Sequence, residues 1–333
     1  MKKSIKIKTF IAITVLAIFG VTSCSESNDP YVTPVPTAPS ADNTIVGKAV
    51  ASSNLTILVA ALQKTELVET LKGAGPYTVF APTNAAFGEA NISVASINSY
   101  TPAQVASLKQ ILLNHVVSGA TTAAQLTDNS YLKTLGLGAA STTNKLSMFV
   151  KKTVTAASTT VKLNNNSTVV SADIAASNGV IHIVDKVITA PTIIDLAATN
   201  SNFSTLAGSL TSASLVTTLQ GTGPFTVFAP DNTAFANLIT EIGSAPTVPQ
   251  YVNVLKYHVV AGNYLASDLP AVISAGPTVT LNPQTITISL TGGPNITGTK
   301  LPVRSASKIT ATDIQANNGV IHVLDKVLLP ATF

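Results

Sequence analysis

One stretch of fifteen residues occurs twice in this chain and sets its organisation. It reads GAGPYTVFAPTNAAF at Gly73–Phe87 and GTGPFTVFAPDNTAF at Gly221–Phe235, with 11 of the 15 positions identical. The two copies begin 148 residues apart in a chain of 333 residues. That spacing is too long for a solenoid repeat and is typical of a whole domain. The sequence therefore predicts two tandem domains with one fold.

The repeated stretch has the pattern of a buried strand followed by a capped helical turn. Residues 77–80 are β-branched or aromatic and favour a short strand that is apolar on both faces. Pro82 is expected to end this strand, and Thr83 to cap a turn that returns Phe87 to the core. None of these residues forms an acid, base or nucleophile arrangement, so we predict no catalytic residue here. The positions expected to be structural are Thr78, Phe80, Pro82, Asn84 and Phe87 in the first copy and Thr226, Phe228, Pro230, Asn232 and Phe235 in the second.

A second repeated stretch closes each half of the chain. It reads NGVIHIVDKVI at Asn178–Ile188 and NGVIHVLDKVL at Asn318–Leu328, with 8 of 11 positions identical. Asn-Gly predicts a tight turn with positive φ angles, and the apolar run after it predicts a buried strand. His182 and His322 lie within this strand and are expected to be structural.

Between the repeated stretches, each half has an amphipathic helix that ends at a histidine. Thr101 and Pro102 are suitable residues to start the first helix, which would carry Leu108 and Leu112 and end at His115. Pro249 starts its counterpart, which ends at His258. Each histidine could be a metal ligand or a buried group bonded to the backbone. Because no second ligand stands at helical spacing, we favour the structural interpretation and expect no metal site. Further strands are predicted at residues 146–150, 161–163, 168–170, 278–281 and 285–290.

The start of the chain has the features of an export signal. Residues 1–23 combine four lysines with an apolar run from Phe10 to Phe19, which is too short to span a bilayer. Small residues precede Cys24, the only cysteine, and this resembles the lipobox of bacterial lipoproteins. An ordinary secretory signal is the alternative. We expect Cys24 to be lipidated and, because Ser25 follows it, the protein to be held at the outer membrane, facing the cell surface or the periplasm.

The charge balance of the exported chain excludes a large basic surface. The full chain has 19 basic and 15 acidic residues, but four of the lysines belong to the signal. The remaining chain has 15 of each, so no nucleic-acid partner is expected. Residues 24–41 carry the lipidated cysteine and a linker rich in Pro, Ser and Thr, which is expected to stay extended. The two domains are then predicted at residues 42–190 and 191–333.

These motifs together resemble the fasciclin-type FAS1 domain in tandem. That family has a TVFAPTNxAF-like segment, a Tyr-His element and an NGVIHxIDxVL-like segment, and all appear here in order. The second half has Tyr257-His258, whereas the first has Asn114-His115. The resemblance implies an α+β fold in which each domain is a small β-sandwich or barrel wedge with helices packed along it. It also implies extracellular adhesion or matrix-type binding without catalysis.

The resemblance also suggests candidate partner contacts. An Asp-Ile pair upstream of the second signature is assigned to receptor contact in animal relatives, and the matching pairs are Asp173-Ile174 and Asp313-Ile314. With Tyr257 and His258 they form the candidate contact set. The alternative is that each Asp makes a local turn hydrogen bond and each Ile fills the core, and we favour it.

Three classes of function follow from the sequence. The first is a lipid-anchored adhesion module whose partner is a surface protein or polysaccharide. The second is a glycan-binding protein that assists polysaccharide capture, although the chain has no Trp and only 5% aromatic residues. The third is an enzyme, but no hydrolase, metalloprotease or nucleotide-binding motif is present. We therefore expect a non-enzymatic adhesion protein with no cofactor and no membrane contact beyond the lipid.

Overall fold

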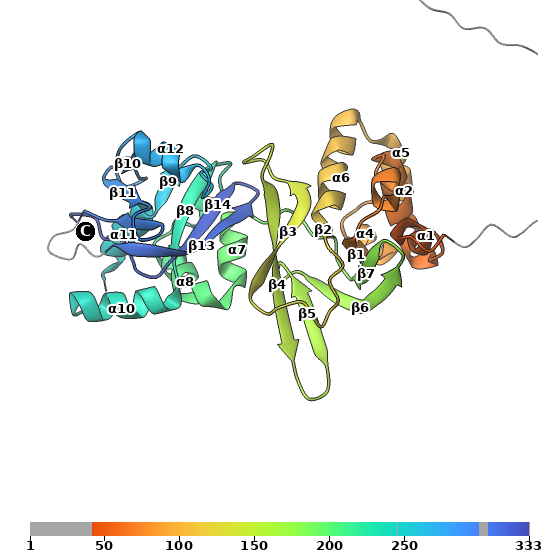
Figure 1. Cartoon of the computed structure of the whole chain (residues 1–333), viewed down its shortest axis with the longest axis horizontal. Coiled ribbons are helices and arrows are strands. Elements are labelled where there is room, and N and C mark those ends of the chain that lie inside the picture. Colours follow the sequence, from red (N-terminus) through yellow and green to blue (C-terminus); the bar gives the residue numbers. More distant parts are fainter. Residues whose placement is uncertain (1–41, 245, 300–305, 333) are drawn as a thin grey trace, which may run out of the picture. The chain divides into compact units, whose positions relative to one another are not determined.

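The computed structural model describes residues 42–244, 246–299 and 306–332 of the chain. The predicted signal segment, Cys24 and the linker that follows lie outside the described residues. Residues from 41 onward form one compact unit that contains both predicted domains. Each domain begins with helices and ends with strands, as Figure 1 shows.

Domain 1 is a closed barrel of seven strands with helices packed beside it. Its strands follow one another around the barrel in chain order. The ring closes because β1 pairs with β2 on one side and, in parallel, with β7 on the other. Its elements are α1 (Ile45–Val50), η1 (Ser53–Leu55), α2 (Thr56–Lys64), α3 (Val68–Lys72), β1 (Tyr77–Pro82), α4 (Asn84–Glu89), α5 (Val94–Ser99), α6 (Pro102–Asn114), β2 (Val116–Ser118), β3 (Ser130–Leu137), β4 (Lys145–Val154), β5 (Thr159–Leu163), β6 (Ser167–Ala176) and β7 (Gly179–Val184).

Domain 2 repeats this plan with shorter strands. Its seven-stranded sheet has the order β10-β11-β12-β13-β14-β8-β9. The backbone N–H of Leu281 donates to the carbonyl of Val259 at 2.7 Å, which brings the two ends of the sheet together. Its elements are α7 (Ile193–Thr199), η2 (Ser201–Phe203), α8 (Ser204–Ser212), α9 (Val216–Gln220), β8 (Phe225–Pro230), α10 (Asn232–Ile242), α11 (Val248–Tyr257), β9 (Val259–Ala261), α12 (Leu269–Ser274), β10 (Thr278–Val279), β11 (Thr285–Ser289), β12 (Asn295–Thr297), β13 (Ser307–Ala316) and β14 (Gly319–Leu324).

The first repeated stretch forms a buried strand in each domain, as predicted. β1 is buried along nearly its whole length, and Phe80 and Phe87 are fully enclosed. The predicted cap is confirmed, because the hydroxyl of Thr83 accepts from the N–H of Ala86 at 3.1 Å. Pro82 ends the strand, as predicted, and as its last residue it pairs in parallel with Val184 at the end of β7.

The second repeated stretch forms β7 and β14, but its turn differs from the prediction. The hairpin loop consists of Ser177 and Asn178, and neither has a positive φ. Gly179 is instead the first strand residue, at φ 156°, and a Cβ there would lie 2.0 Å from the carbonyl oxygen of Tyr77. Glycine is therefore needed because β1 passes so close to β7 at this point.

Several other elements differ from their predicted limits. The cap of α1 is Thr44, whose hydroxyl accepts from Gly47 N–H at 3.2 Å; from the sequence, Asp42 or Asn43 is the residue expected to cap this helix. β6 continues six residues past the predicted end at Val170, because a bulge carries the strand through a polar stretch. Elements that the pattern did not predict are β2, β3, β9, β12, β13, α5 and α12.

The two histidines at the helix ends are structural, as we favoured. His115 Nδ1 lies 2.8 Å from the carbonyl of Ile111 in its own helix, and Nε2 accepts from Ile188 N–H at 2.8 Å. His258 makes the same pair of contacts with Val254 and Leu328. Each ring therefore joins the helix end to the segment that follows the last strand of its domain.

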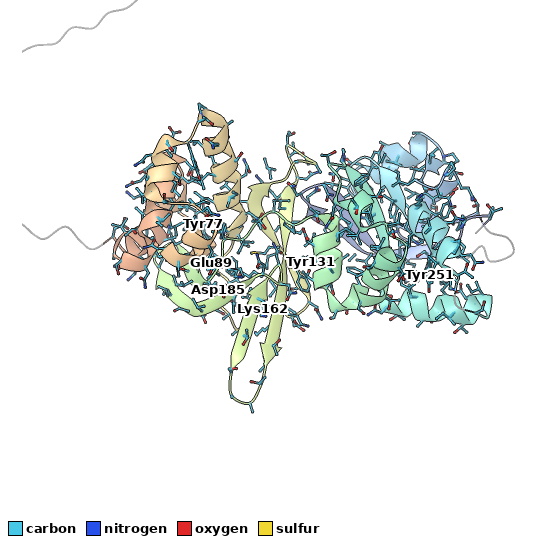
Figure 2. All side chains as sticks on the ribbon, turned by 180° about the vertical axis from the view of Figure 1, so that it is seen from behind. Tyr77, Glu89, Tyr131, Lys162, Asp185 and Tyr251 are labelled. Atoms are coloured by element: carbon cyan, nitrogen blue, oxygen red, sulfur yellow. The ribbon has the colours of Figure 1, made fainter. Side chains whose placement is uncertain are left out.

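The two domains contact each other through β3 and β4 of domain 1. Tyr131, labelled on β3 in Figure 2, accepts a hydrogen bond at its hydroxyl from the Asn200 side chain of domain 2 at 2.9 Å. Its ring packs against Phe149 in a tilted arrangement, with centroids 5.3 Å apart and an interplanar angle of 55°. Phe149 belongs to the apolar core cluster of domain 2. Burial raises the pKa of Tyr131 to about 12, so its hydroxyl stays protonated at this contact.

Candidate functional site

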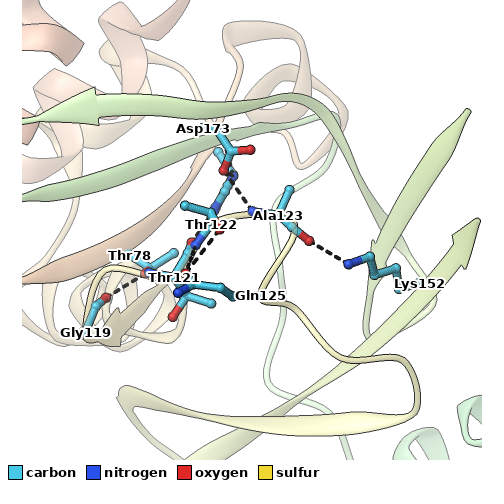
Figure 3. A network of polar contacts seen from close by, with 9 residues as sticks. Thr78, Gly119, Thr121, Thr122, Ala123, Gln125, Lys152 and Asp173 are labelled. Atoms are coloured by element: carbon cyan, nitrogen blue, oxygen red, sulfur yellow. Dashed lines mark hydrogen bonds and ion pairs between the residues drawn. The ribbon is translucent and has the colours of Figure 1, made fainter.

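A polar network joins the predicted structural residues of domain 1 around the loop after β2. Thr78 is fully buried on β1, and its hydroxyl donates to the carbonyl of Gly119 at 2.6 Å. The same oxygen accepts from the N–H of Thr121 at 2.8 Å. Figure 3 shows that this single side chain holds both sides of the loop. A threonine is suitable here because its hydroxyl both donates and accepts.

Asp173 fixes the other side of this loop from the bulge in β6. Its backbone has φ 60°, a left-handed conformation that Asp tolerates better than most residues. Its carboxylate accepts from the N–H of Ala123 at 2.8 Å. Its own N–H donates to Nδ1 of His182 at 3.2 Å, while Nε2 of that ring lies 2.9 Å from the carbonyl of Thr121. In this arrangement Nδ1 is the acceptor and Nε2 the donor of the ring.

Lys152 completes the network in domain 1. Its ammonium group donates to the carbonyls of Ala123, Ala124 and Leu126 at 2.9–3.0 Å, so all three of its protons are used. Figure 3 shows it reaching the loop from β4, on the side away from Thr78. The loop is thus held by a hydroxyl, a carboxylate and an ammonium group, each from a different strand.

Domain 2 contains the same network without the lysine. Thr226 bonds Gly262 and Tyr264 as Thr78 bonds its own loop, and Asp313 at φ 61° accepts from the N–H of Ala266 at 2.8 Å. Nε2 of His322 lies 2.8 Å from the carbonyl of Tyr264. Its Nδ1 has no hydrogen-bond partner within the described part of the chain. Burial lowers the pKa of His322, which keeps the ring neutral.

The candidate partner contacts lie in very different surroundings. Tyr257 and His258 are buried, at 0% and 2% exposure, so a partner cannot reach them in this conformation. Their burial follows from their position at the inward-facing end of α11. Ile314 is buried in the core of domain 2, and Asp313 is half-buried. Asp173, in contrast, is exposed, and Ile174 is half-buried.

The structure brings Asp173 and His182 together with Thr78, and Asp313 and His322 with Thr226. Each Asp carboxylate accepts from a loop far away in the sequence, at Ala123 and Ala266, and not from the local turn that we expected. The remaining structural positions are also internal. Phe80, Phe87, Phe228 and Phe235 are buried, and Pro82 and Pro230 end their strands.

Sequence reasoning missed the role of the asparagines in the repeated stretches. The side chain of Asn84 accepts from Ile57 N–H and donates to the carbonyl of Ser53, so it anchors the start of α2. Asn232 does the same for α8. Asn178 accepts from Ile45 N–H at 2.9 Å and donates to two carbonyls near the end of α3. Their identity in both copies was the only available signal.

The described residues contain neither a metal site nor a membrane-spanning helix. No group of three His, Cys, Asp or Glu side chains in residues 42–244, 246–299 and 306–332 is arranged to hold a metal ion. Within the same ranges, no helix has the length and apolar character needed to cross a bilayer.

Asp173 offers a test of the network. Replacing Asp173 with Ala is expected to destabilise domain 1 by about 1–3 kcal/mol, because Ala123 N–H loses its acceptor and the left-handed backbone becomes strained. Asp173→Asn keeps an acceptor oxygen and tolerates this backbone, so it should cost less than half as much. Urea unfolding of the two variants measures the difference. Equal losses for Ala and Asn would contradict this role.

The fold and its paired networks define a tandem α+β protein in which the repeated motifs hold each barrel together. The chain belongs to the fasciclin domain family, because the family model described as "Fasciclin domain" matches residues 53–190 and 201–330. The structural search agrees with this assignment. A structure titled "Novel Fold Revealed by the Structure of a FAS1 Domain Pair from the Insect Cell Adhesion Molecule Fasciclin I" aligns with 85% of this chain and 95% of its own, with a TM-score of 0.50 and 18% identity.

Related sequences come from bacteria and animals. The uncharacterized protein sll1735 of Synechocystis is 42% identical over 143 residues, which cover 42% of this chain and 98% of that protein. Human periostin is 27% identical over 280 residues, covering 80% of this chain and 30% of its own. The pig transforming growth factor-beta-induced protein ig-h3 is 26% identical and is matched over 35% of its length. This chain therefore spans about a third of these two animal relatives.

Proposed function

We propose that this chain is a non-catalytic adhesion module, exported and held at the outer membrane by a lipid on Cys24. The non-catalytic part of this proposal rests on the surroundings of the histidine side chains. All four histidines are buried, at 0–2% exposure, and each is bonded to the backbone of its own domain. Groups of this kind stabilise the fold and are not available for acid–base chemistry.

The similarity of this chain to other fasciclin-domain proteins supports an adhesive function. The insect protein whose domain pair shares this fold is a cell adhesion molecule by its title. Two domains in one chain also permit weak contacts to combine through avidity, if both engage one surface. The anchor at Cys24 and the outer-membrane location rest on the sequence pattern before this residue. The partner would be a protein or polysaccharide of another cell or surface.

Deletion of the domains tests this function. A strain that keeps residues 1–41 but lacks residues 42–333 is expected to lose most of its attachment to cells or surfaces. Cys24→Ser should give the same loss, because the intact tandem is then released from the membrane. Immunoblotting of the membrane and medium fractions checks expression and release. Unchanged attachment by the deletion strain would contradict an adhesive function.

A further inference from the structure

Domain 1 and domain 2 each have a strand with an open edge at the same place. In domain 2, β12 pairs with β13 only at Ser307 and Lys308, so no strand within the described residues 42–244, 246–299 and 306–332 pairs with the later part of β13 on that edge. In domain 1, β5 pairs with β6 only at Ser167 and Thr168. The open stretches are residues 313–317 of β13 and its turn, and residues 173–177 of β6 and its turn, here called the β13 edge and the β6 edge.

The β13 edge is covered by domain 1 of the same chain. The ammonium group of Lys133 donates to the carbonyl of Asp313, and Gln315 N–H donates to the hydroxyl of Ser147 at 3.0 Å. The backbone N–H groups of Ala139 and Ala140 donate to the side chain and the carbonyl of Asn317 at 2.9 and 2.8 Å. The hairpin built of β3 and β4 therefore supplies hydrogen-bond partners for the polar groups along this edge.

This contact is closely packed. Gln315, Ala316 and Val320 are all 0% exposed under the hairpin and the domain 2 core. A Cβ on Gly138, in the hairpin loop, would lie only 2.8 Å from Cα of Asn317. The hairpin thus contributes three features to this contact. Its lysine amine donates to the β13 edge, its serine hydroxyl accepts from the edge, and its loop lies close to the backbone of the edge.

The β6 edge has the same geometry, but no strand within residues 42–244, 246–299 and 306–332 pairs with it; at its end, the N–H of Ser177 donates to the carbonyl of Asn43 at 2.8 Å. The pairing of β6 with β7 has the register of β13 with β14, since Ala175 faces Val180 as Gln315 faces Val320. The N–H of Ala175 is therefore directed to the open edge like that of Gln315. Asp173, Ala175 and Ser177 are exposed, whereas their domain 2 counterparts are half-buried or buried. The carboxylate of Asp173, with 47% of its side chain exposed, adds a negative charge beside the edge.

We propose that the β6 edge binds a partner protein through a β-hairpin that presents a lysine and a hydroxyl, as β3 and β4 do on the β13 edge. An exposed strand edge adds a partner strand through backbone hydrogen bonds, and the side chains select the partner. The Asp173 carboxylate favours a cationic partner, and the carbonyl of Asp173 is placed to accept from its amine. This proposal rests on the adhesive function and identifies domain 1 as the side that holds the partner.

The chain supplies its own probe for this edge. A peptide of residues 129–151 carrying Ser130→Cys and Val150→Cys can be closed by a disulfide, because these two positions face each other across β3 and β4. The peptide is labelled and titrated into the soluble chain of residues 25–333. Domain 2 competes little for it, since the β13 edge is already held by a hairpin of the same chain at high effective concentration.

Saturable binding is expected, and Ala175→Pro in the chain should weaken it about tenfold by removing the edge N–H. Proline is tolerated on an edge whose N–H faces solvent. Ala175→Arg is the second variant, because it keeps the N–H and repels the lysine. Lys133→Ala in the peptide should also weaken binding. Circular dichroism checks that each chain remains folded.

The remaining outcomes either overturn the proposal or separate it from the adhesive function. Absence of saturable binding, or equal binding by a folded Ala175→Pro chain, would show that the β6 edge does not recognise this hairpin chemistry. A chain that sediments as a dimer, and becomes monomeric on Ala175→Pro, would show that the edge joins two copies instead. Loss of attachment on domain deletion without peptide binding would leave adhesion standing and remove only this proposal. Peptide binding, together with unchanged attachment when the domains are deleted, would support the β6 edge proposal and contradict the adhesive function.

Discussion

Replacing Asn318 with Ala is expected to destabilise domain 2 by about 3 kcal/mol, because three backbone groups, two of them in buried bonds, lose their partner at once. The side chain is 3% exposed. It accepts from the N–H of Ile193 at 3.0 Å and donates to the carbonyls of Leu219 and Gly221 at 2.8 Å each. One residue of the last hairpin thus holds the start of α7 and the end of α9 against the sheet.

Paired variants separate this effect from a general loss of stability. Asn178→Ala removes the same three bonds from domain 1 and should lower the unfolding transition of that domain instead. Asn237→Ala changes an exposed asparagine in α10 and should alter stability by less than about 0.5 kcal/mol. Urea unfolding followed by circular dichroism measures all three. A loss below about 1 kcal/mol for Asn318→Ala would mean that water replaces these bonds.

Acidification is expected to destabilise both domains between pH 6.5 and about 4. Burial lowers the pKa of His115 and His258 from 6.5 to about 4 in the folded chain, and the bonds to Ile111 and Val254 oppose this shift only in part. As the pH falls below 6.5, the unfolded chain binds protons that the folded chain does not. Stability is therefore complete above pH 6.5, and each histidine is expected to cost its domain about 2.5 kcal/mol at pH 4.5.

The measurement is the free energy of unfolding at pH 7.5, 5.5 and 4.5. His258→Gln removes one of the titrating groups from domain 2, so the pH dependence of that domain should become shallower. Domain 1 keeps His115 and should retain its full dependence, which makes it an internal control. Equal stability at pH 7.5 and 4.5 in the unmodified chain would show that these rings are protonated without unfolding.

The fold could be predicted from local chemistry to a large extent. β1 and β8 were evident because their residues are apolar on both faces, and α6 because Thr101 and Pro102 start an amphipathic run. β6 was cut short at Val170, since the polar residues of the bulge interrupt the apolar pattern. β3 was missed because Lys133 and Gly136 break its alternation, and these residues serve the domain contact and the approach to Asn114.

The candidate site could be predicted only in part. The repeated motifs identified His182 and Thr78 as residues of interest, and the family resemblance identified Asp173, but neither showed that they surround one loop. Gln315 and Ser147 meet across 168 residues of chain through a backbone N–H and a hydroxyl, and neither residue stands in a periodic pattern. Contacts of this kind depend on how two finished domains pack. Sequence periodicity describes only how each domain folds.

The most direct test of adhesion is competition by the purified chain. Residues 25–333, added in excess and shown to be folded, should reduce the attachment of cells that carry the full protein, in proportion to concentration. The same chain unfolded by heat should have no effect. Full attachment in the presence of saturating folded chain would contradict the view that these two domains make the adhesive contact.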